Sequence, residues 1–380
     1  MRLFSVLAAI AGLALIAGLV AHFGTDAVAR TLAAIGWGGF VAVCTIHVAL
    51  IVVMGIAWGV LLPGTSAWVP IWGRLVRDSG SEVLPISQVG GYVVGARAVT
   101  IAGVSGSSAA ASTIVDVTLE LFGQLAYTAL ALGWLIYSHP EAQLAAITAI
   151  GLVVAGLLAA AFLAVQRHGF GLLGRLTGIL GRGWAEKTAT GAAALHTALT
   201  RIYQQRARVI SSFLLHFVCW IGGTLEPWIA LRFAGAPLGF AAVLVIESLL
   251  YAARSVAFAI PNAVGVQEGA YILLGVGFGL TPETALALSL LKRARDLTIG
   301  LPVLAAWQLV ESGRLWRRVA APSRARRQWN EAPVRMTGAS ALPAGCDDRA
   351  MSIVDLPKGG QRCAAMMRQP RRSCNGSPKN

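Results

Sequence analysis

The chain has 380 residues, of which 56% are hydrophobic and 13% charged, and its formal net charge is +14. A soluble domain typically has about 45–50% apolar and about 25% charged residues, whereas the mean hydropathy here is +0.68. One soluble core cannot bury that much apolar surface, so the composition excludes an ordinary soluble domain and indicates a membrane protein. The cations gather beside apolar segments, which favours the positive-inside rule over nucleic-acid binding.

The first apolar segment follows Arg2 and covers residues 3–23. It is too long for a typical cleaved signal peptide, although "AVA" at 27–29 imitates a cleavage site, so we expect an uncleaved span. Apolar windows of the length that crosses a bilayer, about 20 residues, follow at 36–62, 109–137, 142–166, 209–234 and 284–310. The pattern predicts an all-α polytopic membrane protein with about six transmembrane helices.

The basic residues set the expected orientation. Loop 167–208 has seven Lys or Arg against one acid, and the segment after 310 is also basic. The short connections 138–141 and 235–237 contain neither Lys nor Arg. Both basic segments and both termini are therefore predicted to be cytoplasmic. Residues 1–315 form the expected membrane domain, and the Pro-, Gly-, Ser- and Arg-rich 316–380 predict a disordered cytoplasmic tail.

Two stretches, 66–104 and 238–280, interrupt the apolar pattern with proline and glycine. Broken backbone exposed to lipid leaves polar groups unpaired at several kcal/mol each, so such breaks lie within protein or a wet cavity. The pattern predicts two broken re-entrant hairpins, with glycines that allow close approach. Full crossings, giving eight or more hydrophobic segments, would leave the termini unchanged. The residues expected at the breaks are Pro85, Gly90, Gly91, Pro261, Gly265 and Gly269.

A shift of 176 residues superimposes the two stretches. Pro85 then coincides with Pro261, and Gly103 with Gly279. The shared order of apolar span, broken hairpin and charged span predicts a first repeat over about 36–137 and a second over about 209–310. Three crossings separate the repeats, so the second is inverted, which is a transporter design. The alternative is a membrane protein with two unrelated proline kinks.

Ionisable residues inside predicted spans are the candidate substrate-binding residues, because buried charge in a membrane is costly and usually marks a substrate or ion path. In "LKRARD" at 291–296, cations outnumber anions, which predicts a cavity for an anionic or strongly polar headgroup. Alternatively, Lys292 and Asp296 form a local pair, or the motif lies in a cytoplasmic loop. The candidates are Arg97, Asp116, Glu120, Glu247, Arg254, Gln267, Glu268, Lys292, Arg293, Arg295 and Asp296.

Other polar residues receive plainer interpretations. Trp68, Trp72, Arg74 and Arg77 are typical of an interfacial helix that lies on anionic lipid. His47 and His216 lie well inside spans and are interpreted as core histidines. No catalytic motif occurs, and the cysteine spacing predicts neither a zinc site nor a disulfide framework. We expect no metal, no cofactor and no catalytic residue.

The hairpin motifs carry a family resemblance. "LPISQVGGYVVGARA" followed by "STIVDVTLE", and "IPNAVGVQEGAYILLG" followed by "ALALSLLKRARD", resemble the two signatures of the lysylphosphatidylglycerol synthase transmembrane-region family. Within it, "RDSGSEVLPISQVGGYVVGARAV" is most similar to the hopanoid-biosynthesis-associated membrane proteins. The resemblance covers about residues 1–315.

The resemblance implies a bacterial inner-membrane lipid transporter or flippase, with membrane lipids and hopanoid biosynthesis proteins as partners. The alternative is an accessory subunit or enzyme of hopanoid side-chain assembly. In that case Asp116, Glu120 and Glu268 would be its acid and base groups, because apolar surroundings can adapt carboxyl groups to that chemistry.

Overall fold

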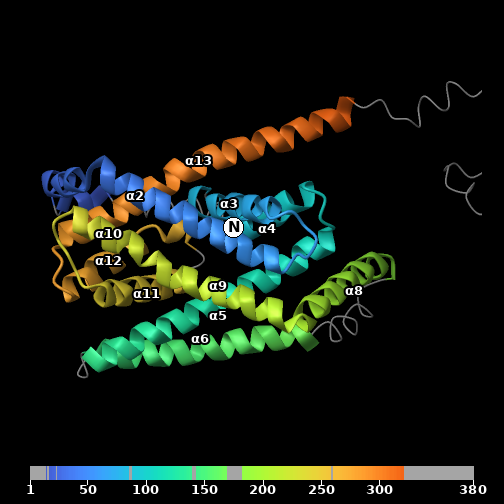
Figure 1. Cartoon of the computed structure of the whole chain (residues 1–380), viewed down its shortest axis with the longest axis horizontal. Helices are drawn as coiled ribbons and strands as arrows, with labels where there is room; N and C mark the ends of the chain where they lie inside the picture. The colour runs from blue at the N-terminus through green and yellow to red at the C-terminus, as the bar shows by residue number, and fades with distance from the viewer. Residues whose placement is uncertain are drawn as a thin grey trace, which may run out of the picture. The chain divides into compact units, whose positions relative to one another are not determined.

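The computed structural model describes residues 14, 17–22, 24–84, 88–138, 143–168, 182–257 and 260–320. Regular structure within these ranges is entirely helical (Figure 1). The helices are α2 (Thr25–Val60), α3 (Trp68–Val83), α4 (Gln88–Ile101), α5 (Gly106–Ser138), α6 (Gln143–His168), α8 (Arg182–Gln204), α9 (Arg206–Gly223), α10 (Leu225–Phe233), α11 (Phe240–Val256), the short η1 (Pro261–Ala263), α12 (Val266–Gly277) and α13 (Pro282–Ala320).

Three described segments are long and apolar enough to cross a membrane: Thr25–Val60, Gly106–Ser138 and Arg206–Phe233. They overlap three of the predicted spans, 36–62, 109–137 and 209–234, almost completely. The predicted span 142–166 falls on α6, whose apolar part Ala149–Ala164 is shorter. The predicted span 284–310 falls on α13, which carries "LKRARD" and is therefore less apolar. The predicted span 3–23 lies mostly outside the described residues, as does all of 321–380.

The stretches predicted as broken hairpins are each a pair of helices. Helices α3 and α4 pack against each other, and so do α11 and α12. Pro85 lies outside the described residues, between α3 and α4. In the second pair, Asn262 and Ala263 have positive φ angles of 50° and 45°, so the helix cannot continue past α11.

Of the four glycines predicted at the breaks, only Gly265 lies between helices, because Gly90 and Gly91 lie inside α4 and Gly269 lies inside α12. A Cβ on Gly91 of α4 would overlap the Ser81 side chain and lie 2.7 Å from the Arg77 carbonyl oxygen, so this glycine permits contact between α3 and α4. Close approach was also expected of Gly265 and Gly269, and that expectation is wrong for Gly269. Gly269 is exposed, and a Cβ there would have no neighbour within 4 Å. Gly265 has a φ of 86°, a conformation that favours glycine.

Gly91→Ala should lower the free energy of unfolding by about 1–3 kcal/mol, because the added methyl group forces α3 and α4 apart. Gly269→Ala is the matched control in α12, where alanine meets open space and helix propensity favours it over glycine. Thermal unfolding of both variants in the same detergent measures the difference. Equal stability of the two variants would show that α3 and α4 do not need this contact.

The turn before α5 recurs before α13, 176 residues later. Gly103 and Gly279 both have positive φ, and their N–H groups donate to the carbonyls of Thr100 and Val276 at 3.1 and 3.0 Å. The next two bonds also correspond. Val104 N–H donates to Val99 O and Leu280 N–H to Gly275 O, while the Ser105 and Thr281 hydroxyls accept from Ser108 and Thr284 N–H at 3.3 Å each. Sequence similarity at this spacing thus has a matching local structure.

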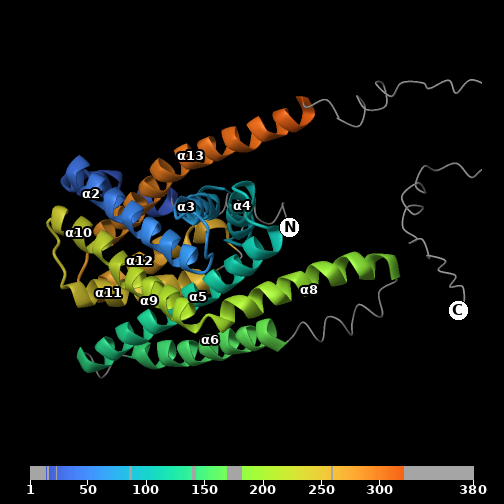
Figure 2. The same ribbon diagram turned by 45° about the vertical axis from the view of Figure 1, so that its right-hand side comes forward.

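The two helix pairs pack against the long helices. Helix α3 contacts α2 and α13, while α11 contacts α5 and α12 contacts α13 (Figures 1 and 2). Helices α2 and α9 contact each other, and α6 lies along α5. The largest buried apolar cluster joins residues of α2, α5, α10, α11, α12 and α13. This packing brings the charged faces of α3, α5, α10, α11 and α13 toward a common interior.

Candidate functional site: a charged cavity

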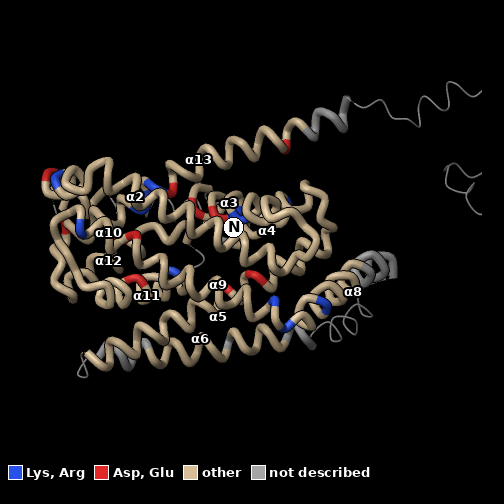
Figure 3. Tube along the Cα trace, viewed as in Figure 1, with Lys and Arg blue, Asp and Glu red and all other residues tan. Residues whose placement is uncertain are grey.

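A cavity of about 380 Å³ lies among α2, α3, α4, α5, α9, α10, α11 and α13. Its lining combines aromatic residues with an unusual number of charges for the interior of an apolar bundle. Figure 3 shows basic and acidic positions close to one another along these helices. The charged and histidine side chains of the lining are His47, Arg74, Arg77, Asp78, Glu82, Glu120, Glu226, Arg254, Arg295 and Asp296.

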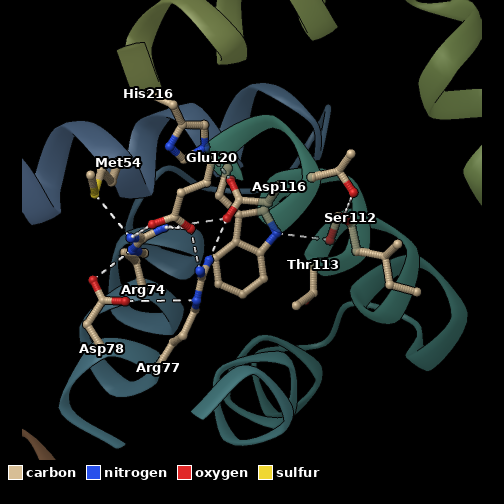
Figure 4. Close-up of polar contacts among 12 residues, drawn as sticks. Met54, Arg74, Arg77, Asp78, Ser112, Thr113, Asp116, Glu120 and His216 are labelled. Atoms are coloured by element: carbon tan, nitrogen blue, oxygen red, sulfur yellow. Dashed lines mark hydrogen bonds and ion pairs between the residues drawn. The ribbon is translucent and has the colours of Figure 1, made fainter. Parts of the chain in front are cut away.

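The first cluster joins α3 to α5 and α9 (Figure 4). Arg74 donates to Glu120 at 2.6 Å and to Asp78 at 2.7 Å. Arg77 donates to Asp116 at 2.7 Å and also bonds Glu120. His216 of α9 contacts the second oxygen of Asp116 at 2.9 Å.

Spacing explains why these side chains meet. Arg74 and Arg77 are three residues apart, and Asp116 and Glu120 are four apart, so each pair occupies one helical face. Trp58 of α2 supports the neighbouring turn by donating to the Ser112 hydroxyl at 3.1 Å. Bidentate contacts between guanidinium and carboxylate groups are among the strongest in proteins. The cluster therefore fixes α3 against α5.

The second cluster joins α11 and α12 to α13. Lys292 donates to Glu247 at 2.7 Å, and Tyr271 bonds the other oxygen of Glu247. Arg293 donates to Glu268 at 2.7 Å, and the same carboxylate accepts the N–H of Gly265 at 2.7 Å. Lys292, Glu247 and Glu268 are almost completely buried. Here the helix pair supplies the acid through α11 and the long helix α13 supplies the base, whereas in the first cluster α3 supplies the bases and α5 the acids.

The two helix pairs are joined where their breaks lie. Arg254 at the end of α11 donates to both oxygens of Glu82, at the end of α3, at 2.9 Å. Asn262 in η1 donates to the backbone carbonyl of Glu82 at 2.6 Å. Arg254 also donates to Gln267 of α12 at 2.9 Å. We call Glu82, Arg254 and Asn262 the junction.

A third group of charges lies against α2. Arg295 bonds Glu226 of α10 and donates to Asp296 at 2.6 Å. His47 of α2 contacts the other oxygen of Glu226 at 3.0 Å. The group ties α2 to α10 and α13 at the wall of the cavity.

Each cation of the three groups and of the junction has a carboxylate partner. The six cations are Arg74, Arg77, Arg254, Lys292, Arg293 and Arg295, and the eight carboxylates are Asp78, Glu82, Asp116, Glu120, Glu226, Glu247, Glu268 and Asp296. With neutral histidines, their net charge is −2. The predicted excess of cations is therefore wrong, because counting within "LKRARD" missed carboxylates from other helices. Lys292 also pairs with Glu247 and not with Asp296.

Four of the predicted site residues line the cavity: Glu120, Arg254, Arg295 and Asp296. Asp116, Glu247, Gln267, Glu268, Lys292 and Arg293 belong to the polar clusters but do not line it. Glu268, a predicted substrate-binding residue, is fully buried. Arg97 is not brought to the site either. It is half exposed and contacts Glu311 of α13.

The interfacial interpretation of residues 68–77 is also wrong in its basic part. Trp68 is exposed, but Arg74 and Arg77 are buried against carboxylates of α5. A helix that lies on lipid and a helix that turns a charged face inward share one amphipathic pattern. Only the groups that the charged face contacts distinguish the two kinds of helix. Here these groups are Asp116, 39 residues from Arg77, and Glu120, 46 residues from Arg74.

Residues missed by the sequence interpretation include Glu82, Glu226 and His216. Glu226 is an isolated acid without a second charge at helical spacing, whereas Glu82 lies four residues after Asp78, a spacing that the sequence interpretation did not use. A signal did exist for His216, since it lies inside an apolar span. Within the described residues, no group of three or more His, Cys, Asp or Glu is arranged to hold a metal ion.

Fold and cavity together define a multi-pass, all-helical membrane protein with a charged interior site. The chain belongs to the family described as the lysylphosphatidylglycerol synthase TM region, which matches residues 5–303. Membership indicates a function related to membrane lipids. No curated protein and no solved structure matches the chain.

Proposed function

We propose that the protein transports a lipid across the bacterial inner membrane by alternating access around the charged cavity. The observation that carries the proposal is a cavity whose charged lining comes from α3 and α5 on one side and α10, α11 and α13 on the other. Its volume of about 380 Å³ lies in the range of small-ligand sites. Such a site accommodates a polar headgroup while the apolar part of the lipid stays in the bilayer.

The proposed transport mechanism uses the two helix pairs as re-entrant hairpins of an inverted repeat. The recurring turn before α5 and α13 supports the repeat, and the junction at the ends of α3 and α11 supports a meeting of the hairpin tips. Broken helices that meet at a central polar site are a transporter architecture. Access changes when one half moves relative to the other about the cavity.

The proposed substrate is a hopanoid or another amphiphile with a strongly polar headgroup. Because the cations lining the cavity are already paired with carboxylates, a headgroup that both donates and accepts hydrogen bonds fits better than a simple anion. Ser255 lines the cavity and is exposed at the bundle surface, next to Val256, which is 84% exposed. We propose that the headgroup enters here, between α5 and α11, from the lipid side.

Deleting the gene tests the hopanoid assignment. Hopanoids extracted from separated inner and outer membranes should be redistributed between them, with every biosynthetic intermediate still present. Complementation with the wild-type gene should restore the distribution. Unchanged amounts and distribution would overturn the hopanoid assignment, and a missing side-chain intermediate would favour an enzyme of side-chain assembly. Of the three acid and base groups that this alternative requires, only Glu120 lines the cavity, and both of its oxygens are bonded by arginines; Asp116 and Glu268 do not line it.

The proposed orientation places both termini and α8 in the cytoplasm. In a variant without native cysteines, Arg201→Cys in α8 should react with a membrane-impermeant maleimide only after permeabilisation. Gly235→Cys, in the short connection after α10, should react in intact cells. Both positions are exposed, so access to the reagent depends on the side of the membrane. The reverse labelling pattern would overturn the orientation.

A further inference from the structure

The His216–Asp116 pair lies behind the cavity and does not line it. The two side chains are 0% exposed and 2.9 Å apart. The other ring nitrogen of His216, Nδ1, is buried and has no hydrogen-bond partner among the described residues. A buried polar atom without a partner is uncommon and calls for an explanation. The unpartnered atom belongs to a histidine, the side-chain type that ordinarily gains or loses a proton near neutral pH.

Charged neighbours of the pair come mainly from α3 and α5. Arg77 and Arg74 approach Asp116 at 2.7 and 3.6 Å, and both contact Glu120, while Asp78 contacts Arg74. The other helices packed against α9 contribute no further partner to the pair among the described residues. Met54 of α2 is uncharged, His47 of α2 contacts Glu226 of α10, and Arg201 of α8 is exposed.

This cluster has one more negative charge than positive charges when the His216–Asp116 pair carries no proton. Two guanidinium groups, of Arg74 and Arg77, face the three carboxylates of Asp78, Asp116 and Glu120. An uncompensated charge inside a bundle is costly. One proton on the His216–Asp116 pair brings the cluster to neutrality.

Arg77 connects the pair to the cavity, because it lines the cavity and contacts Asp116 and Glu120. When the His216–Asp116 pair carries no proton, Asp116 and Glu120 both form ion pairs with Arg77. With the proton on the pair, Asp116 attracts Arg77 less, so the guanidinium is available to an acceptor oxygen on a headgroup. Headgroup binding and proton binding therefore favour each other, and linkage makes the effect reciprocal.

We infer that the His216–Asp116 pair is a proton-binding site linked to headgroup binding in the cavity, so that lipid movement is coupled to proton movement. The coupling half of this inference rests on the proposed transport function. In each cycle the pair takes one proton from water on one side of the membrane and releases one proton to water on the other. No electron is transferred and no other bond changes.

Nitrogen-15 NMR of histidine-labelled protein in lipid nanodiscs tests the proton site without any lipid substrate. The signal lost in His216→Gln belongs to His216, and its response to a scan of pH through the ordinary histidine range reports whether this ring binds a proton. Asp116→Asn should weaken proton binding at His216 at least about tenfold, because the neighbouring anion is removed. The exposed His22 serves as control and should not respond to Asp116→Asn. A His216 signal that is constant over this range, or indifferent to Asp116→Asn, would overturn the inference.

Proteoliposomes test the coupling, with fluorescent nitrobenzoxadiazole-labelled phosphatidylglycerol as the probe and dithionite quenching as the readout. A pH gradient should change the wild-type rate about 5-fold or more, the lower end of usual coupling strengths. His216→Gln should remove the dependence on the gradient. A wild-type rate indifferent to the gradient, or a variant as dependent as the wild type, would overturn the coupling. If wild type moves no probe, the proposed transport fails for this lipid, and NMR still decides the proton site.

Discussion

Lys292→Met should lower the free energy of unfolding by about 3–5 kcal/mol, the usual cost of removing one partner from a buried ion pair. Methionine fills nearly the same space as lysine, but it leaves the Glu247 carboxylate fully buried with Tyr271 as its remaining partner. Thermal unfolding of the purified protein in one detergent measures the loss. The amount of variant in the membrane should fall in parallel.

The double variant Lys292→Met, Glu247→Gln provides the control. A neutral amide keeps the size of the glutamate and removes the unpaired charge, so most of the lost stability should return. If the single variant is no less stable than the double one, the charge of Glu247 is not buried as the structure places it. The pair would then lose its role as the tie between α11 and α13.

Cross-linking the junction should block lipid transport almost completely and reversibly. The proposed alternating access requires the ends of α3 and α11 to separate, and the junction joins them through Glu82 and Asn262. Glu82→Cys and Asn262→Cys, combined in a chain without native cysteines, can be bridged by a short cleavable thiol reagent. The dithionite assay should show transport before bridging, none after it, and recovery on cleavage.

Each single cysteine variant, treated with the same reagent, separates the effect of the bridge from that of thiol modification. The single variants should keep the rate that they had before treatment. Full transport by the bridged protein would show that the hairpin tips stay together through the cycle. Access would then have to change elsewhere around the cavity.

Local patterns in the sequence predicted the helical class and the position of the two helix pairs. Apolar windows identified α2, α5 and α9 with α10, because length and composition decide whether a helix can cross a bilayer. Pro261 and Gly265 identified the second break, since both residue types have backbone preferences that do not depend on tertiary structure, whereas Gly90, Gly91 and Gly269 lie inside helices. The spacing of Asp116 and Glu120 likewise predicted that both occupy one face.

Pairing between distant helices could not be predicted in this way. Arg74 was interpreted as a lipid anchor because its partner Glu120 is 46 residues away and no local feature connects them. Arg97 was placed near the break by sequence proximity, yet its position on α4 turns it toward Glu311, 214 residues further on. The sign of the net charge was predicted wrongly for the same reason, since this charge is a sum over α3, α5, α10, α11, α12 and α13.

Helix α13 carries three buried or half-buried cations, each of which has a carboxylate partner that is made before the helix. Glu226, Glu247 and Glu268 precede Lys292, Arg293 and Arg295 in the chain, so the acids have left the ribosome when the cations emerge. Each cation would cost about 2.5–3.5 kcal/mol at the centre of an isolated inserting helix. The order of synthesis therefore makes entry of α13 into the bilayer depend on the preceding helices. A chain that lacks the earlier acids should consequently leave this last helix outside the membrane. Cellular quality control should then recognise the chain by the exposed helix.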